Sequence, residues 1–225
     1  VMMMLAALRR LVLVDRALRE ACWLFREMRA QCLMLRRREV GLIGFGHVGR
    51  AVAGRLGAFG ARVAYTDPVR PTAAEERAYG VRFLPFETLL AECDIISLHC
   101  PGGGSNRHLL DGRALGCMRP GAILVNCARG DLVEEAALIS ALAAGQIAAA
   151  GLDLFETEPL PAGNQLLTLD NVCLSPHTAE SVFDSIANVA DHALGNMLRI
   201  HRGEVLAAKD AVVIPLRPRF TAPPG

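Results

Sequence analysis

Residues 40–50 read VGLIGFGHVGR, in which an apolar run leads directly into a glycine-rich turn. Gly44, Gly46 and Gly49 follow the spacing G-x-G-x-x-G where a strand is expected to end and a helix to begin. There the first glycine permits a tight turn, the second lets the backbone approach a pyrophosphate, and the third lets the helix pack closely on the strand. Because a plain strand-to-helix turn could carry the same glycines, this motif needs support from elsewhere in the chain.

Asp67 provides that support, since it closes the next apolar run, VAYTD. A carboxylate at the end of this strand can accept hydrogen bonds from ribose hydroxyls, and its charge repels the extra phosphate of NADP. The expected cofactor is therefore NAD, with His47 and Val48 of the glycine turn also in contact with it. Two observations leave alternatives open: Arg70 could pair with that phosphate, and Asp67 before Pro68 is also a turn signal.

Apolar runs alternate with helical stretches from residue 40 onward, the pattern of a parallel sheet with crossover helices. The predicted fold class is α/β, a Rossmann-type doubly wound parallel sheet with flanking helices. The division expected along the chain is an N-terminal helical arm or linker (1–38), an NAD-binding Rossmann domain (39–180), a C-terminal return helix (181–203) and an irregular tail (204–225). Strands are expected at 40–43, 62–66, 94–99, 122–126, 148–153 and 172–175, and helices at 47–56, 73–79, 86–92, 112–118, 133–144 and 181–200.

Composition excludes several classes of protein. The 225 residues are 52% hydrophobic with a formal net charge of +1, which excludes a disordered chain and gives no footprint for nucleic acid. The apolar start is interrupted by Arg9 and Arg10, too early for a membrane-spanning helix. The seven cysteines include no C-x-x-C pair, so neither a disulfide framework nor a metal site is expected, and a reducing, cytoplasmic compartment fits best.

Four further stretches follow expected strand ends, where ligands bind in open parallel sheets. With the glycine turn, they resemble the D-isomer-specific 2-hydroxyacid dehydrogenases over residues 40–179, a match of five motifs in order. The stretches are SLHCPGGGSNRHLL (97–110), MRPGAILVNCARGDLV (118–133), AGLDLFETEPLP (150–161) and NVCLSPHTA (171–179).

The resemblance implies a role for particular residues. Arg129 corresponds to the arginine that holds the substrate carboxylate, His177 to the general acid and base, and Glu158 to its orienting carboxylate. Asp153 corresponds to the aspartate that contacts the nicotinamide carboxamide. The resemblance further places Cys100 and Pro101 at the adenosine pocket, Cys127 and Ala128 beside the nicotinamide, and Asn106, Arg129 and His177 in contact with the cofactor.

The reduction of a 2-oxo acid requires the same residue types, whatever the family resemblance. Reducing a 2-oxo acid adds a hydride to carbon and a proton to oxygen, and histidine is the side chain best suited to deliver that proton near neutral pH. A carboxylate beside the imidazole fixes its tautomer. A substrate carboxylate calls for the planar fork of an arginine. Taken singly, Arg129, Glu158 and His177 could each be an ordinary loop residue, so the prediction rests on their joint occurrence at strand ends.

The chain also departs from the family pattern. The family carries most of a substrate domain before the glycine turn, so we expect a truncated chain whose apolar, Met-rich start is exposed, and a homodimer formed through residues 1–38 and the Rossmann domain. The glycine-rich segment 102–106 is expected to be mobile. Glu158 argues against the formate-oxidising branch, which has Gln there.

Three functions remain in competition. The leading hypothesis is an NAD-dependent oxidoreductase that transfers a hydride between nicotinamide and a D-2-hydroxy acid or 2-oxo acid. The alternatives are a non-catalytic NAD(H)-binding regulatory module of corepressor type and an inactive fragment of an enzyme. Turnover of 2-oxo acids separates the first from the second.

Overall fold

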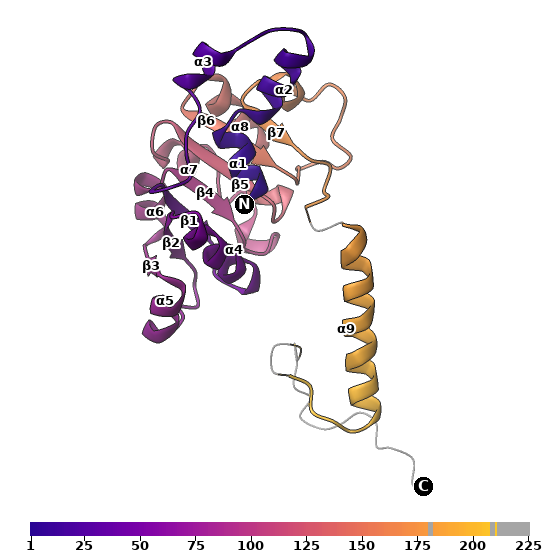
Figure 1. Ribbon diagram of the computed structural model, residues 1–225. Coiled ribbons are helices and arrows are strands. Elements are labelled where there is room, and N and C mark those ends of the chain that lie inside the picture. Colours follow the sequence, from indigo (N-terminus) through magenta and orange to yellow (C-terminus); the bar gives the residue numbers. More distant parts are fainter. Residues whose placement is uncertain (180–181, 208–209, 211–225) are drawn as a thin grey trace. The chain divides into compact units, whose positions relative to one another are not determined.

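The computed structural model describes residues 1–179, 182–207 and 210. Seven strands form one parallel sheet in the order β3-β2-β1-β4-β5-β6-β7 (Figure 1). Because the order runs outward in both directions from β1 and β4, the sheet is doubly wound and the predicted fold class is confirmed. The strands are β1 (Glu39–Ile43), β2 (Arg62–Thr66), β3 (Val81–Phe83), β4 (Ile95–Leu98), β5 (Ala122–Asn126), β6 (Ile147–Leu152) and β7 (Val172–Leu174).

The helices after residue 40 begin and end within two residues of their predicted positions, wherever those positions are described. The sequence missed β3, which has only three residues and follows directly on Gly80, the left-handed residue that ends α5. The helices are α1 (Met2–Leu8), α2 (Leu11–Arg19), α3 (Phe25–Arg29), α4 (His47–Ala58), α5 (Ala73–Tyr79), α6 (Phe86–Glu92), α7 (Gly112–Cys117), α8 (Glu135–Ala143) and α9 (Phe183–His201), with short 3-10 turns η1 (Gly104–Asn106), η2 (Gly130–Leu132) and η3 (Gln165–Thr168).

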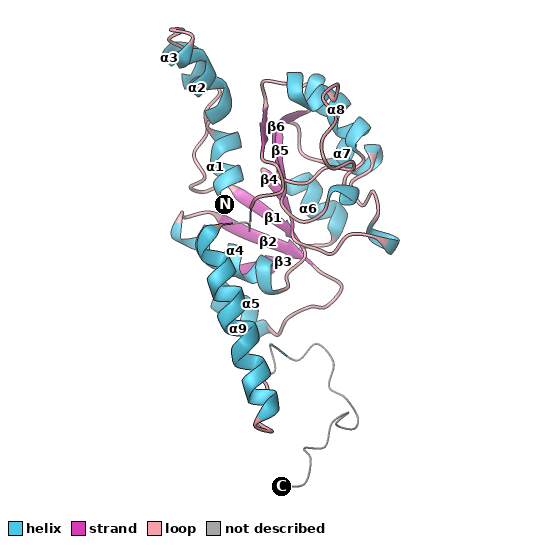
Figure 2. Ribbon diagram, turned by 90° about the vertical axis from the view of Figure 1, so that its right-hand side faces the viewer, coloured by secondary structure: helices cyan, strands magenta, loops and turns pink. Residues whose placement is uncertain are grey.

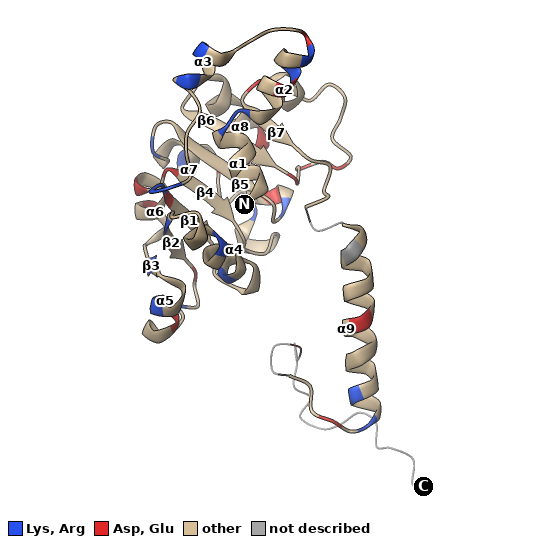
Figure 3. Cartoon of the chain, viewed as in Figure 1, with Lys and Arg blue, Asp and Glu red and all other residues tan. Residues whose placement is uncertain are grey.

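The sheet buries both of its faces, and Figure 2 shows helices on either side of it. One face packs against α6, α7 and α8, and the other against α1 and α4. Successive residues of a strand point to opposite faces, so Val40 and Leu42 belong to one core cluster and Ile43 to the other. The strands β4, β5 and β6 contain no charged residue, and most charges lie on the surrounding helices and loops (Figure 3).

The N-terminal segment differs from the prediction in one respect. The Met-rich start was expected to be exposed, but Met3 and Met4 are 3% and 1% exposed and belong to the core. Helix α1 lies so close to β6 that a Cβ on Gly151 would be 2.9 Å from the Met3 Cβ. The expectation failed because α1 packs on the apolar strands β5 and β6. Residues 11–34 instead carry the exposed apolar side chains Leu11, Val12, Leu18, Trp23, Phe25 and Met34.

The chain forms two compact units, Val1–Ala179 and Glu180–Gly225. The second contains α9, which corresponds to the predicted return helix and exposes several large apolar side chains, Phe183 most of all. Residue 181 and most of the predicted tail 204–225 lie outside the described residues. In the described part of the chain, no helix has both the length and the apolar character needed to cross a membrane.

Candidate active site

The glycine turn between β1 and α4 gives its three glycines different environments. Gly44 has a φ of 98°, and a Cβ there would lie 2.6 Å from the backbone of His99. A Cβ on Gly49 would lie 2.4 Å from the Gly44 carbonyl oxygen, so α4 packs tightly on the turn. Around Gly46 no described atom lies within 4 Å of a Cβ position. A side chain would therefore collide with the backbone at Gly44 and Gly49, whereas the space around Gly46 is open.

The amino end of α4 suits an anion. Gly46 is its N-cap residue, and among the described residues no side chain caps the helix. The exposed His47 and Val48 form its first turn, where free N–H groups and the helix dipole favour a phosphate. The open position at Gly46 and the uncapped helix fit a dinucleotide pyrophosphate.

Asp67 is fixed beside this turn. One of its carboxylate oxygens accepts the Phe45 N–H at 2.7 Å and the other accepts the Val69 N–H at 2.7 Å. Each oxygen keeps a further lone pair for a hydroxyl group. The residue therefore shapes the loop after β2 while remaining able to bind a ribose.

The loop after β4 makes hydrogen bonds through Gly103 and Asn106. The Gly103 N–H donates to Asp131 at 2.7 Å, and a Cβ on Gly102 would lie 2.3 Å from the same carboxylate. Asn106 donates to the Pro101 carbonyl at 3.0 Å, a contact within its own loop. Gly102 permits a close approach to Asp131, a residue that the sequence analysis did not single out, and the mobility expected for residues 102–106 stays a prediction.

Arg129 is presented by the loop after β5. The buried Asn126 accepts the Ala128 N–H at 3.0 Å and donates to the Arg129 carbonyl at 2.8 Å. The Arg129 guanidinium donates to the Ala128 carbonyl at 2.6 Å, and no carboxylate among the described residues forms an ion pair with it. An Asn followed by a turn was the sequence signal that could have identified Asn126 as a positioning residue.

Glu158 and His177 form a direct pair. The His177 Nδ1 lies 2.7 Å from one Glu158 oxygen, and the other oxygen accepts the Phe155 N–H at 3.0 Å. These contacts, the one with His177 first, hold the pKa of the Glu158 carboxyl below its ordinary value. Because Nδ1 faces the carboxylate, the free ring nitrogen is Nε2.

Asp153 holds the loop that carries His177. Its two oxygens accept the N–H groups of Thr178 and Ala179 at 3.0 and 2.9 Å, and its carbonyl accepts the His177 N–H at 2.9 Å. The side chain is buried, so its contacts fix the backbone after β7. Together they explain how His177 is kept at a φ of 55°, which is unusual for a residue with a side chain.

A hollow of about 510 Å³ brings part of the predicted site together. His108 pairs with Glu156, one of the residues that line this hollow. Several predicted site residues do not line this hollow: those of the glycine turn, Asp67, Cys100, Asn106, Cys127, Ala128 and Asp153. Its walls include Pro101, Gly102, Gly103, Arg129, Gly130, Asp131, Leu154, Phe155, Glu156, Glu158 and His177.

The cysteines near the site are not activated. Burial raises the pKa of the Cys100 and Cys127 thiols, so neither is a ready nucleophile. All seven cysteines lie in the described part of the chain and are unpaired. Within the same part, no group of three or more His, Cys, Asp or Glu residues could hold a metal ion.

The fold and this edge of the sheet define a dinucleotide-binding domain. Residues 1–179 match the family described as D-isomer specific 2-hydroxyacid dehydrogenase, NAD binding domain. The chain belongs to this family, and NAD, the expected cofactor, is confirmed. The match includes residues 1–38, which the sequence resemblance did not cover.

Known relatives support the same assignment. The chain is 39% identical to a glyoxylate reductase of Korarchaeum cryptofilum over 205 residues, covering 90% of this chain and 61% of the relative. It is 38% identical to a D-3-phosphoglycerate dehydrogenase of Archaeoglobus fulgidus, covering 95% of this chain and 40% of the relative. The NAD complex of a D-isomer specific 2-hydroxyacid dehydrogenase from Lactobacillus delbrueckii superposes with a TM-score of 0.80 at 31% identity, covering 92% and 66%. The chain thus spans less than two thirds of these relatives.

Proposed function

We propose that the protein to which this chain belongs is an NAD-dependent oxidoreductase acting between a D-2-hydroxy acid and the corresponding 2-oxo acid. In this proposal the chain supplies the cofactor site and the acid–base pair. The observation that carries it is the pairing of His177 with Glu158 at 2.7 Å in a hollow that also contains Arg129. An imidazole, its carboxylate and a free guanidinium are the groups that this reaction requires.

The cofactor would lie along the carboxyl edge of the sheet. The pyrophosphate would be held by the glycine turn, that is by Gly44, Gly46, His47, Val48 and Gly49. The space around Gly46 is open, and no described side chain caps the amino end of α4. The remaining contacts proposed are Asp67 with the ribose, Cys100, Pro101 and Asn106 at the adenosine, and Cys127, Ala128, Arg129, Asp153 and His177 at the nicotinamide end.

His177 moves the proton. When bound, NADH supplies the hydride that the carbonyl carbon takes up. In that direction His177 delivers a proton from Nε2 to the carbonyl oxygen, and in the reverse direction Nε2 accepts it from the hydroxyl. Glu158 faces Nδ1 throughout, so it fixes the ring orientation and stabilises the imidazolium form.

Arg129 orients the substrate. Its guanidinium has no carboxylate partner among the described residues, so two parallel hydrogen bonds remain available to a substrate carboxylate. Asn126 positions the loop from which the side chain extends. Holding the carboxylate places the adjacent carbonyl carbon, which limits the reaction to acids of this type.

The test begins with a fluorescence titration of this chain with NADH. Glyoxylate, hydroxypyruvate and phosphohydroxypyruvate are then added in excess, with acetone as the control that has a carbonyl but no carboxylate. We expect NADH to bind and to be oxidised by at least one of the acids and not by acetone. Binding without oxidation by any acid would show that this chain is not a working dehydrogenase, and would favour a non-catalytic NAD(H)-binding module or an inactive fragment of an enzyme.

We further propose that the protein is a homodimer formed through residues 1–38 and the Rossmann domain. Support comes from Trp23, Phe25 and Met34, which are 76%, 64% and 71% exposed, a density of apolar surface that a monomer rarely leaves uncovered. They border a hollow of about 500 Å³ whose walls also include Leu18 and Met28. A second copy of this chain would cover it.

Trp23 is the single tryptophan, so its emission reports on this surface directly. We expect its emission maximum to shift to shorter wavelength as the protein concentration rises, in parallel with the mass measured by light scattering. Trp23→Glu should give a monomer at concentrations where Phe59→Ser, a change of another exposed aromatic residue, leaves the mass unchanged. A monomeric wild-type chain at all concentrations would contradict the proposal.

We also infer a reducing, cytoplasmic location, which is supported by seven cysteines that form no pair. Fractionation of cells that express the protein tests it. Recovery of the protein from an oxidising compartment with its thiols paired would contradict it.

A further inference from the structure

Two arginines lie beside the loop that follows β2, and both are paired with consecutive carboxylates of α5. Arg70, in the loop itself, donates to Glu76 from Nε at 2.9 Å and from Nη2 at 3.3 Å. Arg50 of α4 donates to Glu75 at 2.7 Å and to the Phe45 carbonyl at 3.2 Å. Both of these positive charges are thus already compensated.

The Arg70 side chain is held in place by two groups, the Glu76 carboxylate and the Phe83 ring. Besides its two bonds to Glu76, its guanidinium carbon lies 4.9 Å from the centre of the Phe83 ring, a cation–π contact. Glu76 is in turn fixed by the Tyr65 hydroxyl, which donates to it at 2.6 Å. The Glu76 side chain is only 15% exposed, whereas that of Arg70 is 59% exposed. The carboxylate is therefore the fixed partner and the arginine the one that could move.

The position of Arg70 bears on the choice between two cofactors. It is three residues after Asp67, whose carboxylate is fixed next to the glycine turn. A 2′-phosphate on a ribose bound at Asp67 would meet that negative charge and would need a cation to offset it. Arg70 is the cation of that loop, but Glu76 already occupies the Nε–Nη2 edge of its guanidinium, an edge that could bind a phosphate through two parallel hydrogen bonds, and the carboxylate charge offsets that of the arginine.

We propose that Glu76 is a specificity-determining residue: by holding Arg70, it denies a partner to the 2′-phosphate of NADP and makes the site selective for NAD. The inference rests on the proposed cofactor site of this chain. Asp67 repels the phosphate, and Glu76 removes the group that could compensate for that repulsion. Specificity of this kind combines an unfavourable contact with the absence of a favourable one.

The test is Glu76→Gln, which removes the charge but keeps an oxygen that can accept from Tyr65. Dissociation constants for NADH and NADPH are measured on the full chain by cofactor fluorescence. We expect the affinity for NADPH to rise about tenfold, the value of one modest charge-assisted hydrogen bond, and that for NADH to change less than about twofold. Glu76→Asp, which shortens the carboxylate, should give a smaller rise.

A double variant separates the proposed role from a structural one. Arg70→Ala in the Glu76→Gln chain should return NADPH affinity to the wild-type value, while Arg70→Ala alone should change it little, because the wild-type arginine is engaged. Glu92→Gln is the matched control, since it breaks a carboxylate–arginine pair with Arg82 on other elements.

The outcomes are distinct. If wild type binds NADH and Glu76→Gln leaves the ratio of the two dissociation constants unchanged, the inference is wrong and Glu76 only stabilises the loop. If the rise persists in the double variant, Arg70 is not the phosphate partner and the inference is also wrong. A wild-type chain that binds neither cofactor would overturn the proposed function, and this inference with it.

Discussion

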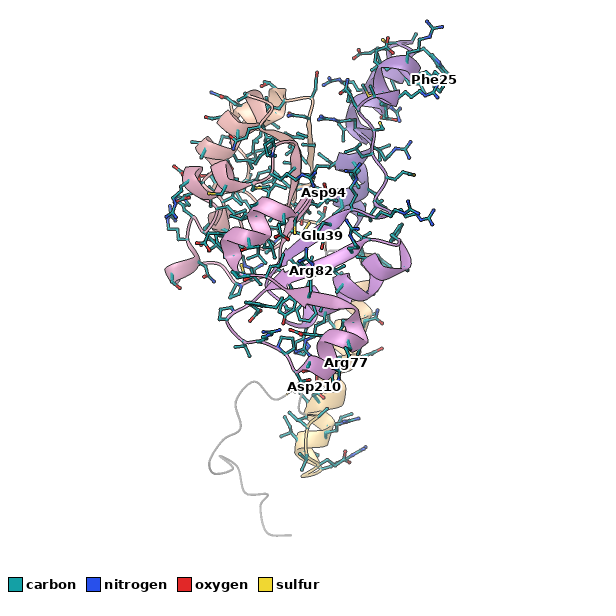
Figure 4. The ribbon with its side chains drawn as sticks, turned by 90° about the vertical axis from the view of Figure 1, so that its left-hand side faces the viewer. Phe25, Glu39, Arg77, Arg82, Asp94 and Asp210 are labelled. Atoms are coloured by element: carbon teal, nitrogen blue, oxygen red, sulfur yellow. The ribbon has the colours of Figure 1, made fainter. Side chains whose placement is uncertain are left out.

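The charged residues at the amino edge of the parallel sheet differ from Arg129 at its carboxyl edge. At the amino edge, where the strands begin, Glu39 and Asp94 are each paired with two arginines, and Glu39, Arg82 and Asp94 lie close together (Figure 4). At the carboxyl edge, where the strands end, Arg129 has no carboxylate partner among the described residues. The difference separates charges that hold the fold together from charges that remain available to a ligand.

The pairing at the amino edge follows from the register of the strands. Glu39 of β1 lies opposite Arg62 of β2 and accepts a hydrogen bond from it at 2.9 Å, and Arg82 of β3 reaches the same carboxylate at 3.0 Å. Asp94, just before β4, accepts the Glu39 N–H at 2.9 Å and Arg119 at 2.9 Å. These groups satisfy one another, so a ligand would have to displace an existing partner.

The carboxyl edge uses its polar groups to position loops. Asn126, Asp131 and Asp153 each bind backbone N–H groups of the loops that carry the proposed site. Arg129 and His177, which these loops carry, keep donors or acceptors that are free for a ligand. Donors and acceptors that are left free in this way contribute little to the stability of the fold. Proteins accept such a loss of stability at their functional sites.

The largest effect expected from this difference is on catalysis. His177→Gln should lower the rate of 2-oxo acid reduction by about 10²- to 10⁴-fold, because the proton donor is lost. The dissociation constant for NADH should stay within about twofold of wild type, since His177 is one of many contacts proposed for the cofactor whereas it is the only proton donor proposed for the reaction. Stopped-flow oxidation and fluorescence titration measure the two quantities.

His201→Gln is the control for that measurement, because His201 is exposed at the end of α9. A His177→Gln chain that keeps its turnover would remove this residue from the acid–base role. A chain that loses NADH affinity to the same extent as turnover would show that His177 mainly shapes the cofactor site.

Much of this arrangement could be predicted from the sequence because the relevant signals are local. Glycine spacing located the turn at Gly44, and apolar runs located six of the seven strands. The motif order brought Arg129, Glu158 and His177 to one edge, and they line one hollow. The pairings between distant residues could not be predicted, since they depend on which strands become neighbours.

The contact between Gly103 and Asp131 is an example. Twenty-eight positions separate them, and the glycines of residues 102–104 alone suggested a mobile loop. The burial of Met3 and Met4 was missed for the same reason, because the surface that they cover is assembled from β5 and β6. The network of Glu39 and Asp94 likewise exists only once β1, β2 and β4 have paired.

A smaller effect is expected from His99, which follows β4 at the carboxyl edge. Burial lowers its pKa to about 4, so the unfolded chain, with an ordinary value near 6.5, binds the proton more tightly. The free energy of unfolding should therefore be unaffected above about pH 7 and decline from about pH 6.5 to about pH 4, by about 3 kcal/mol.

Urea denaturation at a series of pH values measures this decline. His99→Gln keeps a group that can bond to Ser97, whose hydroxyl lies 3.0 Å from the histidine Nε2. The variant should show a shallower decline over the same pH range, whatever its stability at pH 7. Equal slopes for the two proteins would mean that other groups cause the acid sensitivity.

The smallest effect is expected at the amino edge. Asp94→Asn removes the charge that faces Arg38 and Arg119 but keeps an acceptor for the Glu39 N–H, so unfolding free energy should fall by only about 1 kcal/mol. The loss should shrink in high salt, because both arginines are partly exposed to screening ions. NADH affinity should not change, since this edge lies at the opposite end of the strands from the cofactor site. A variant that lost NADH affinity without losing stability would break the distinction between the two edges, because it would couple the paired charges at one end of the strands to the ligand at the other.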